Sequence, residues 1–173
     1  MSNAAARAEV AHVHVHSLRV RSRLEVLVAR VTSARGVAGY GFTFNLAPWV
    51  ARDMAAWDAA AREAGVPLCK LLGGAPRGSI RVAKGSTALD PWAAGSVEAV
   101  RARAPAALLA PHGHPWEIAW CATLAAALGS AATVLVPDEP AQASVSVPDE
   151  PGIGVDWSLE PGFASLAWQD PGH

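Results

Sequence analysis

The chain contains little cysteine and no excess of charge of either sign, and each shortage excludes a class of protein. Its two cysteines, Cys69 and Cys121, are too few for a disulfide scaffold and lack the spacing of metal ligands. With 14 basic and 15 acidic residues the net charge is −1, so no surface for nucleic acid or an anionic membrane is expected. Residues 1–10 lack the apolar segment of a signal peptide, and we therefore expect a cytoplasmic protein.

Long apolar runs are also scarce, with one exception between residues 118 and 136. This run carries no formal charge and approaches the roughly 20 residues that cross a bilayer. Gly129 and Ser130 interrupt it, separating an Ala- and Leu-rich part from a β-branched part. A buried helix followed by a buried strand explains this pattern, and no membrane span is predicted.

Apolar side chains, in contrast, are abundant. They make up 51% of the 173 residues, against 17% for charged residues, so the chain can form a core and is not expected to be disordered. The length fits one domain, or one domain with a small appendage.

The first part of the chain has the period of strands and then the period of a helix. Residues 12–16, 24–31 and 37–44 follow an extended pattern, which predicts a three-stranded antiparallel meander. From about residue 47, apolar residues recur every three or four positions as far as Ala64, which predicts an amphipathic helix. Gly65 then ends that helix.

The second part alternates short strands with helices, an order that favours parallel βαβ units. The predicted strands are residues 80–83, 106–110 and 133–136, and the predicted helices are residues 97–103 and 116–128. The Pro-rich residues 136–151 are typical of edge strands and turns. A final short helix is expected within residues 157–168.

Three segments resemble the enolase superfamily, specifically its branch of mandelate racemase and muconate lactonizing enzyme. Residues 37–44 are similar to the end of that family's N-terminal meander. Residues 56–74 resemble the helix and the Leu-Leu-Gly-Gly turn that join the capping domain to the barrel, and they are the most specific match. Within residues 90–157, Ala110-Pro111-His112 is similar to the end of the seventh barrel strand, and residues 147–155 resemble the returning C-terminal segment.

The resemblance implies a capping domain on a modified (β/α) barrel. In that family a magnesium ion, held by carboxylates from three barrel strands, stabilises the enediolate formed when a proton next to a substrate carboxylate is removed. The base is a lysine of a Lys-x-Lys motif or a histidine paired with an aspartate. Asp90 and His112 match that aspartate–histidine dyad, in which the carboxylate fixes the imidazole tautomer and raises its basicity.

The chain is too short for the whole family fold. Fewer than about 100 residues follow Ser79, whereas an eight-stranded barrel occupies about 250. Residues 80–86 resemble the first barrel strand, yet Asp90 already matches the sixth, so the segment that would carry the Lys-x-Lys pair and the three metal carboxylates is missing. We predict an α+β fold: a cap-like antiparallel three-stranded meander plus helix in residues 1–76, followed in residues 77–173 by a truncated α/β barrel remnant.

Three functional hypotheses follow, and whether the chain is an enzyme stays open between them. The first is a degenerate homologue of acid-sugar dehydratases and racemases, without metal-dependent catalysis, that serves as a binding or structural protein. The second is an active isomerase or lyase that abstracts the α-proton of a carboxylate substrate with His112 and Asp90. The third is a metal-binding module through His12, His14 and His16, which share one face of a strand.

No cofactor is predicted for this chain, although magnesium is the cofactor of the family. The carboxylates that could still meet around a cation near His112 are those of Glu98, Glu117, Asp138 and Glu139.

For two neighbours of His112 we expect a structural role instead of a catalytic one. His114 is expected to be a solvated loop histidine, and Glu117 is expected in the first turn of the next helix, where a carboxylate complements the helix dipole.

In a closed barrel every strand is paired on both sides. In a shortened barrel some strands have an open edge. Either the Pro-rich C-terminal segment or another copy of the chain has to cover them. We therefore expect a homo-oligomer, with a small carboxylate as its candidate ligand.

Overall fold

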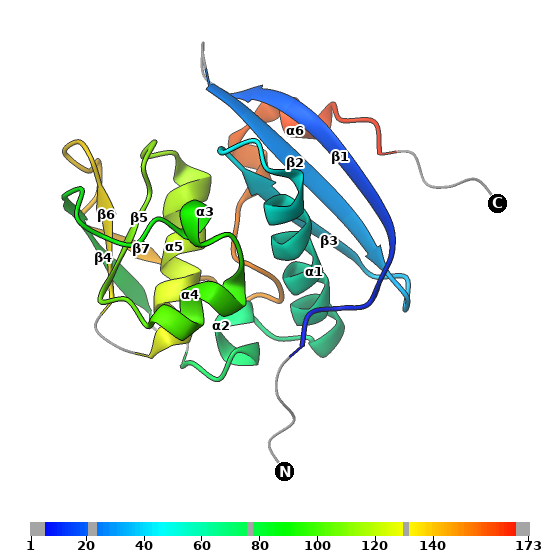
Figure 1. The fold of residues 1–173 in the computed structure, drawn as a ribbon, viewed down its shortest axis with the longest axis horizontal. Coiled ribbons are helices and arrows are strands. Elements are labelled where there is room, and N and C mark those ends of the chain that lie inside the picture. Colours follow the sequence, from blue (N-terminus) through cyan, green and yellow to red (C-terminus); the bar gives the residue numbers. More distant parts are fainter. Residues whose placement is uncertain (1–5, 21–23, 76–77, 130–131, 169–173) are drawn as a thin grey trace.

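The computed structural model describes residues 6–20, 24–75, 78–129 and 132–168. They form a three-stranded sheet and a four-stranded sheet, with helices packed against both (Figure 1). The predicted boundary between residues 76 and 77 lies outside the described residues.

The first sheet is the predicted antiparallel meander. It consists of β1 (Val10–Val20), β2 (Leu24–Ser33) and β3 (Ala38–Thr43), paired in the order β1-β2-β3. Both pairs are antiparallel, with Val15 opposite Ala29 and Ala29 opposite Gly41.

Helix α1 (Pro48–Ala64) lies against one face of this meander (Figure 1). It ends at Gly65, whose φ of 67° lies in the left-handed region that glycine adopts without strain. Helix and strand approach closely because β3 carries Gly41, where a Cβ would lie only 2.2 Å from the backbone oxygen of Ala51. Small residues on both elements therefore set the distance between α1 and the sheet.

The opposite face of the meander is covered by the C-terminal segment. This segment contains the 3-10 helix η1 (Trp157–Leu159) and α6 (Pro161–Ala164), which replace the single helix expected there. Tyr40 of β3 contacts Phe163 edge-on at a ring-centroid distance of 5.6 Å, and Trp157 stacks on Phe163 at 4.8 Å. These aromatic contacts hold the end of the chain against its beginning.

The second sheet contains β4 (Ser79–Lys84), β5 (Ala107–Leu109), β6 (Thr133–Val136) and β7 (Ser144–Ser146). Its order is β5-β6-β4-β7. As predicted, β6 is parallel to both β4 and β5, whereas β7 is antiparallel to β4.

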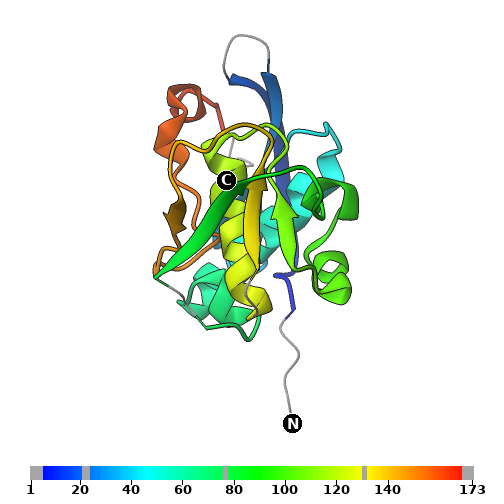
Figure 2. The ribbon, with the colours of Figure 1, turned by 90° about the vertical axis from the view of Figure 1, so that its left-hand side faces the viewer.

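Helix α5 (Pro115–Leu128) packs behind this sheet in the view of Figure 2. It ends at Gly129, and β6 follows, so the uncharged run is a buried helix and then a strand, as predicted. In the described part of the chain, no helix has the length and apolar character needed to span a membrane.

Both edges of the three parallel strands are covered from within the chain. β7 takes the free edge of β4, with Val145 opposite Ile80. On the outer edge of β5, Leu89 N donates to Ala107 O at 3.2 Å, and Leu89 O accepts from Leu109 N at 2.8 Å. The expectation that the Pro-rich C-terminal segment covers an open edge is confirmed. The homo-oligomer stays a prediction, and these edges are no longer a reason for it.

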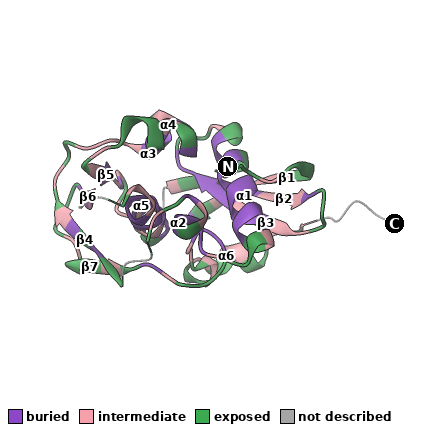
Figure 3. Ribbon diagram, turned by 90° about the horizontal axis from the view of Figure 1, so that it is seen from below, coloured by how far each residue is buried: buried purple, intermediate pink, exposed green. Residues whose placement is uncertain are grey.

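Three shorter helices complete the fold. α2 (Leu68–Leu71) follows α1, and α3 (Pro91–Ala94) and α4 (Val97–Arg103) lie between β4 and β5 in the chain. The buried residues concentrate on α1, α5 and the strands beside them (Figure 3), and one core cluster includes Trp57 of α1 and Trp116 of α5. The two sheets are therefore packed around a shared interior.

Candidate functional site

His112 lies in the short loop between the end of β5 and the start of α5. A turn closes this loop, since Gly113 N donates to Ala110 O at 3.0 Å, and Gly113 has a φ of 61°. The loop follows the carboxyl end of a parallel strand, which is where α/β folds place their ligands.

The Glu117 carboxylate is the centre of the site. It is fully buried, accepts three N–H bonds and lies within hydrogen-bond distance of the His112 ring. Oε1 accepts from the backbone N–H of His112 at 3.0 Å and of His114 at 3.3 Å. Oε2 lies 3.0 Å from Nε1 of Trp92 and 3.0 Å from Nδ1 of His112. Glu117 is thus in the first helical turn as predicted, but it also fixes the loop before the helix.

The same contacts assign the tautomer of His112. Trp92 Nε1–H can only donate, and the other Glu117 oxygen already accepts two backbone N–H groups, so the carboxylate acts as acceptor throughout. With Glu117 ionised, His112 therefore carries a proton on Nδ1, and in the neutral ring Nε2 has a lone pair. An imidazole oriented by a carboxylate in this way is a good hydrogen-bond or proton acceptor.

Asp90, the expected partner of His112, has a different position. Its Oδ1 accepts from Trp92 N at 2.9 Å and so caps the N-terminus of α3. Burial raises the pKa of Asp90 above its ordinary value, although the N–H groups of Trp92 and Ala93 oppose that shift. The carboxylate hydrogen-bonded to the His112 ring is that of Glu117, whereas Asp90 interacts with His112 through its charge.

The interpretation of His114 as a solvated loop residue is wrong. Its side chain is 1% exposed and forms the N-cap of α5. Nδ1 accepts from Trp116 N at 3.1 Å, so the proton is on Nε2, which lies 2.5 Å from Oε1 of Glu160. His114 therefore ties the start of α5 to the C-terminal segment.

Sequence reasoning missed the pairing of His112 with Glu117. The available signal was the spacing His114-x-x-Glu117, which is that of a capping box with histidine in the place of serine or threonine. A carboxylate at that position turns back toward the residues before the helix, where His112 lies.

A pocket of about 700 Å³ opens beside His112. This volume is within the usual range for small-molecule sites. Its walls come from β4, the loop after β5, the first half of α5, the end of β6 and the loop after it, β7, and the residues before and within η1. The apolar lining residues include Val82, Ile118, Val136, Val145 and Leu159, and the charged ones are Asp138, Glu139 and Asp156.

The carboxylates near His112 do not fit a magnesium ion. Magnesium requires oxygen ligands with free lone pairs, whereas both Glu117 oxygens accept N–H bonds. Glu98 is in the first turn of α4, and Asp138 and Glu139 are exposed after β6. No three His, Cys, Asp or Glu side chains of the described residues are gathered so that they could hold a metal ion.

The histidines of β1 do not form a metal centre with other described residues either. They share the sheet face that the C-terminal segment covers, and His16 contacts Trp168 edge-on at 4.9 Å. His14 lies opposite Arg30 of β2. The observed environment of the row is thus aromatic and basic rather than that of a chelating cluster.

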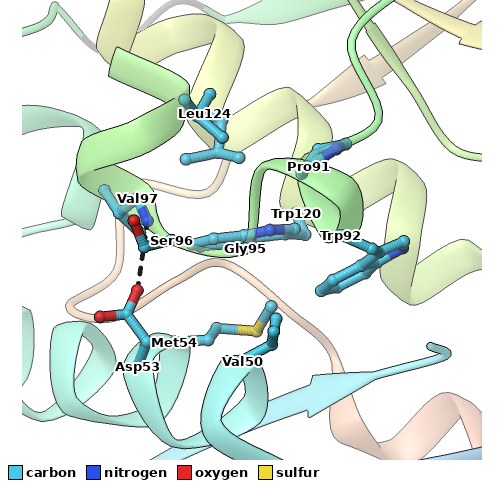
Figure 4. A pocket seen from close by; sticks show the side chains of 11 residues that line it. Val50, Asp53, Met54, Pro91, Trp92, Gly95, Ser96, Val97, Trp120 and Leu124 are labelled. Atoms are coloured by element: carbon cyan, nitrogen blue, oxygen red, sulfur yellow. Dashed lines mark hydrogen bonds between the residues drawn. The ribbon is translucent and has the colours of Figure 1, made fainter. Parts of the chain in front are cut away.

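A second cavity, of only about 10 Å³, lies between α1, the α3–α4 region and α5 (Figure 4). At its edge Asp53 accepts from Val97 N at 3.2 Å and from Arg7 Nη1 at 2.8 Å. Burial raises the pKa of Asp53. This volume holds about one water molecule, so the cavity belongs to the joint between the two parts of the chain and not to a ligand site.

No protein-family model matches the chain, and no curated protein matches it. Among solved structures, a mandelate racemase/muconate lactonizing enzyme from Polaromonas sp. JS666 matches with a TM-score of 0.54 and 13% identity, covering 87% of this chain and 94% of that one. The chain shares its fold with that family. The resemblance to the enolase superfamily is therefore confirmed at the level of the fold.

Two other solved structures show the range of the matches. L-Talarate dehydratase from Polaromonas sp. JS666, in complex with Mg and L-glucarate, has a TM-score of 0.50 at 13% identity, covering 86% of this chain and 94% of the dehydratase. The mandelate racemase/muconate lactonizing enzyme from Bordetella bronchiseptica RB50 is 20% identical with a TM-score of 0.38, over 76% of this chain. In that match the chain spans about half, 51%, of the relative's length.

Proposed function

We propose that this chain is a shortened relative of the mandelate-racemase-like enzymes that binds a small organic molecule without metal-dependent catalysis. The observation that carries the proposal is the setting of His112. Its Nδ1 is held by Glu117, and the residue lines a pocket of about 700 Å³. Nε2 is then the ring nitrogen that can meet a ligand.

The order of the second sheet supports descent from a barrel. In a closed barrel the first and last strands are neighbours. β4 resembles the first strand and pairs in parallel with β6, while β5, similar to the seventh, pairs with the other side of β6. β7 occupies the edge of β4 where a second strand would lie. The four-stranded sheet is thus what remains when the middle of the barrel is removed.

The carboxylates of the site argue against the chemistry of the family. A proton next to a carboxylate is very weakly acidic, and a divalent cation supplies most of the stabilisation of the resulting dianion. The Glu117 oxygens are occupied by N–H donors, so that carboxylate cannot serve as a ligand to such a cation. Binding is the function that these residues support best.

Ligand binding without a metal can be tested by NMR. Small neutral probes such as 2-phenylethanol are expected to shift the backbone amide signals of Gly113, Ile118 and Val145, equally in EDTA and in magnesium. Ala119→Phe, which fills the pocket, should abolish these shifts, whereas the matched Ala164→Phe on the exposed part of α6 should not. Shifts that require magnesium, or that survive Ala119→Phe, would contradict the proposal.

A second candidate function is proton abstraction by Nε2 of His112, because a buried carboxylate orients the ring as in a general base. This candidate predicts exchange of the α-hydrogen of a hydroxycarboxylate such as L-glucarate with deuterated solvent, followed by NMR. The exchange would be lost in His112→Asn and retained in Asp90→Asn, because Asp90 caps α3 and the ring is hydrogen-bonded to Glu117. The first proposal predicts no exchange in any of these proteins, with or without magnesium.

A further inference from the structure

The charged groups around the pocket are nearly all of one sign. Asp138, Glu139 and Asp156 line it, and neither lysine nor arginine is found among its described lining residues. Asp156 uses Oδ1 to cap η1, accepting from Ser158 N at 3.0 Å, but it keeps its negative charge in doing so. The pocket therefore has an excess of negative charge, which favours a cation and disfavours a carboxylate.

His112 adds a hydrogen-bond acceptor to this surface. With Nδ1–H donated to Glu117, the neutral ring has its lone pair at Nε2. An ammonium group has three N–H donors and no acceptor, whereas a carboxylate has only acceptors. A neutral His112 in the pocket wall therefore favours the same ligand class as the charges do.

One feature of the pocket opposes this conclusion. α5 begins at the pocket wall with Pro115, and a helix N-terminus carries a partial positive charge of roughly +0.5 that attracts anions. The full negative charge of Glu117 lies in that first turn and accepts the N–H of His114. Glu117 therefore cancels the attraction of the helix end for an anionic ligand.

The remaining wall is apolar. Ile118, Val136 and Val145 line the pocket together with several prolines, and such a surface stabilises a hydrocarbon body through burial. A ligand that satisfies both parts of the pocket has an apolar body and one amino group.

We propose that the pocket selects a small organic amine, cationic at neutral pH, over the corresponding carboxylate. This inference rests on the proposed function, since it specifies the ligand class of the same pocket. It also differs from the small carboxylate that the resemblance to the family leads us to expect.

The test compares three probes of similar size: 2-phenylethylamine, 2-phenylethanol and 3-phenylpropionate. Binding is followed through the amide signals of Gly113, Ile118 and Val145. We expect the amine to bind at least about tenfold more tightly than the carboxylate, with a preference that shrinks as salt screens the charges. The double variant Asp138→Asn/Glu139→Gln should reduce the preference severalfold, whereas Asp149→Asn, exposed and outside the pocket, should leave it unchanged.

The outcomes separate this inference from the proposed function. If the carboxylate binds in the pocket as tightly as the amine, the inference is wrong and the pocket remains a ligand site. If the amine is preferred equally in the double variant, Asp138 and Glu139 are not the selecting groups and the inference fails on that point. If none of the three probes shifts the pocket amides, both the inference and the proposed function are overturned.

Discussion

Nδ1 of His112 lies 3.0 Å from Oε2 of Glu117, a carboxylate that is fully buried and already accepts from the indole N–H of Trp92. Five positions separate the histidine from this glutamate, so the loop and the helix that follows it form a single polar unit. The ring that resembles half of an aspartate–histidine dyad is thus held by a neighbour in sequence, whereas Asp90 caps α3.

Replacing Glu117 with glutamine should destabilise the fold. The N–H groups around Glu117 face two carboxylate oxygens, whereas a glutamine amide has one oxygen and one NH₂ group. The NH₂ group would face N–H donors and leave them without an acceptor. The expected loss is about 1–3 kcal/mol in the free energy of unfolding, measured by urea denaturation. Glu139→Gln, an exposed change of the same chemistry, should have little effect. Equal stability of Glu117→Gln and wild type would show that the cluster does not contribute.

Replacing Gly41 with alanine should also destabilise the fold. The new Cβ would lie 2.2 Å from the backbone oxygen of Ala51, so α1 or β3 has to move. We expect a cost of about 1–3 kcal/mol, the usual range for overpacking. Gly78→Ala is the control, because a Cβ there meets no atom within 4 Å. Thermal unfolding that is unchanged in Gly41→Ala would mean that the helix does not approach the sheet this closely.

Removing the cover from the edge of β4 should promote self-association. Val145 lies opposite Ile80 in the antiparallel pair of β7 with β4, and proline at this position cannot supply a strand N–H. Val145→Pro should therefore show a larger average mass than wild type in light scattering at micromolar concentration, since an open edge pairs with other chains. Val145→Thr keeps the strand and should match the wild type. An unchanged mass for Val145→Pro would indicate that β7 does not protect the edge.

The stability of the chain should depend on the charge of Asp58. This carboxylate is fully buried on α1, where it accepts from Tyr40 N at 2.9 Å and Ile153 N at 2.8 Å and pairs with Arg62. Burial raises the pKa of Asp58 above its ordinary value of 3.8, and these partners offset the shift only in part.

A raised pKa in the folded state fixes the sign of this pH dependence. The contribution of Asp58 to stability is complete below its unfolded pKa of 3.8 and is lost as the pH rises through the folded pKa. Asp58→Asn does not titrate, so the difference in unfolding free energy between variant and wild type should move in favour of the variant as the pH rises above about 4. Urea denaturation of both proteins at several pH values measures this difference. A difference that stays constant with pH would contradict the prediction.

Much of the fold is predictable from the sequence because its elements have clear periods. The alternation in β1 and β2 and the three- and four-residue recurrence up to Ala64 correspond to the observed strands and helix. α3 has a local signal too, since Asp90 and Pro91 are typical of an N-cap and of the first helical position. The pairing of β7 with β4 had no such local signal, because the three residues of β7 carry almost no pattern and their partner is distant in the chain.

The candidate site was predictable in its residues but not in its contacts. The resemblance pointed to His112, which does line the large pocket. It also assigned Asp90 as the partner of His112. That pairing belongs to the geometry of a full barrel, and this chain is too short for one. The burial of His114 and its capping of α5 depend on Glu160 and the C-terminal segment, which no local pattern places nearby.

The most direct test of this account is the ¹⁵N NMR spectrum of the His112 ring in wild type, Asp90→Asn and Glu117→Gln at a pH where the ring is neutral. We predict the Nδ1–H tautomer in wild type and in Asp90→Asn, because asparagine keeps the cap of α3 and the ring partner is Glu117. Glu117→Gln should shift the tautomer ratio toward Nε2–H. A tautomer ratio that changes in Asp90→Asn and stays constant in Glu117→Gln would contradict the account and restore the aspartate–histidine dyad.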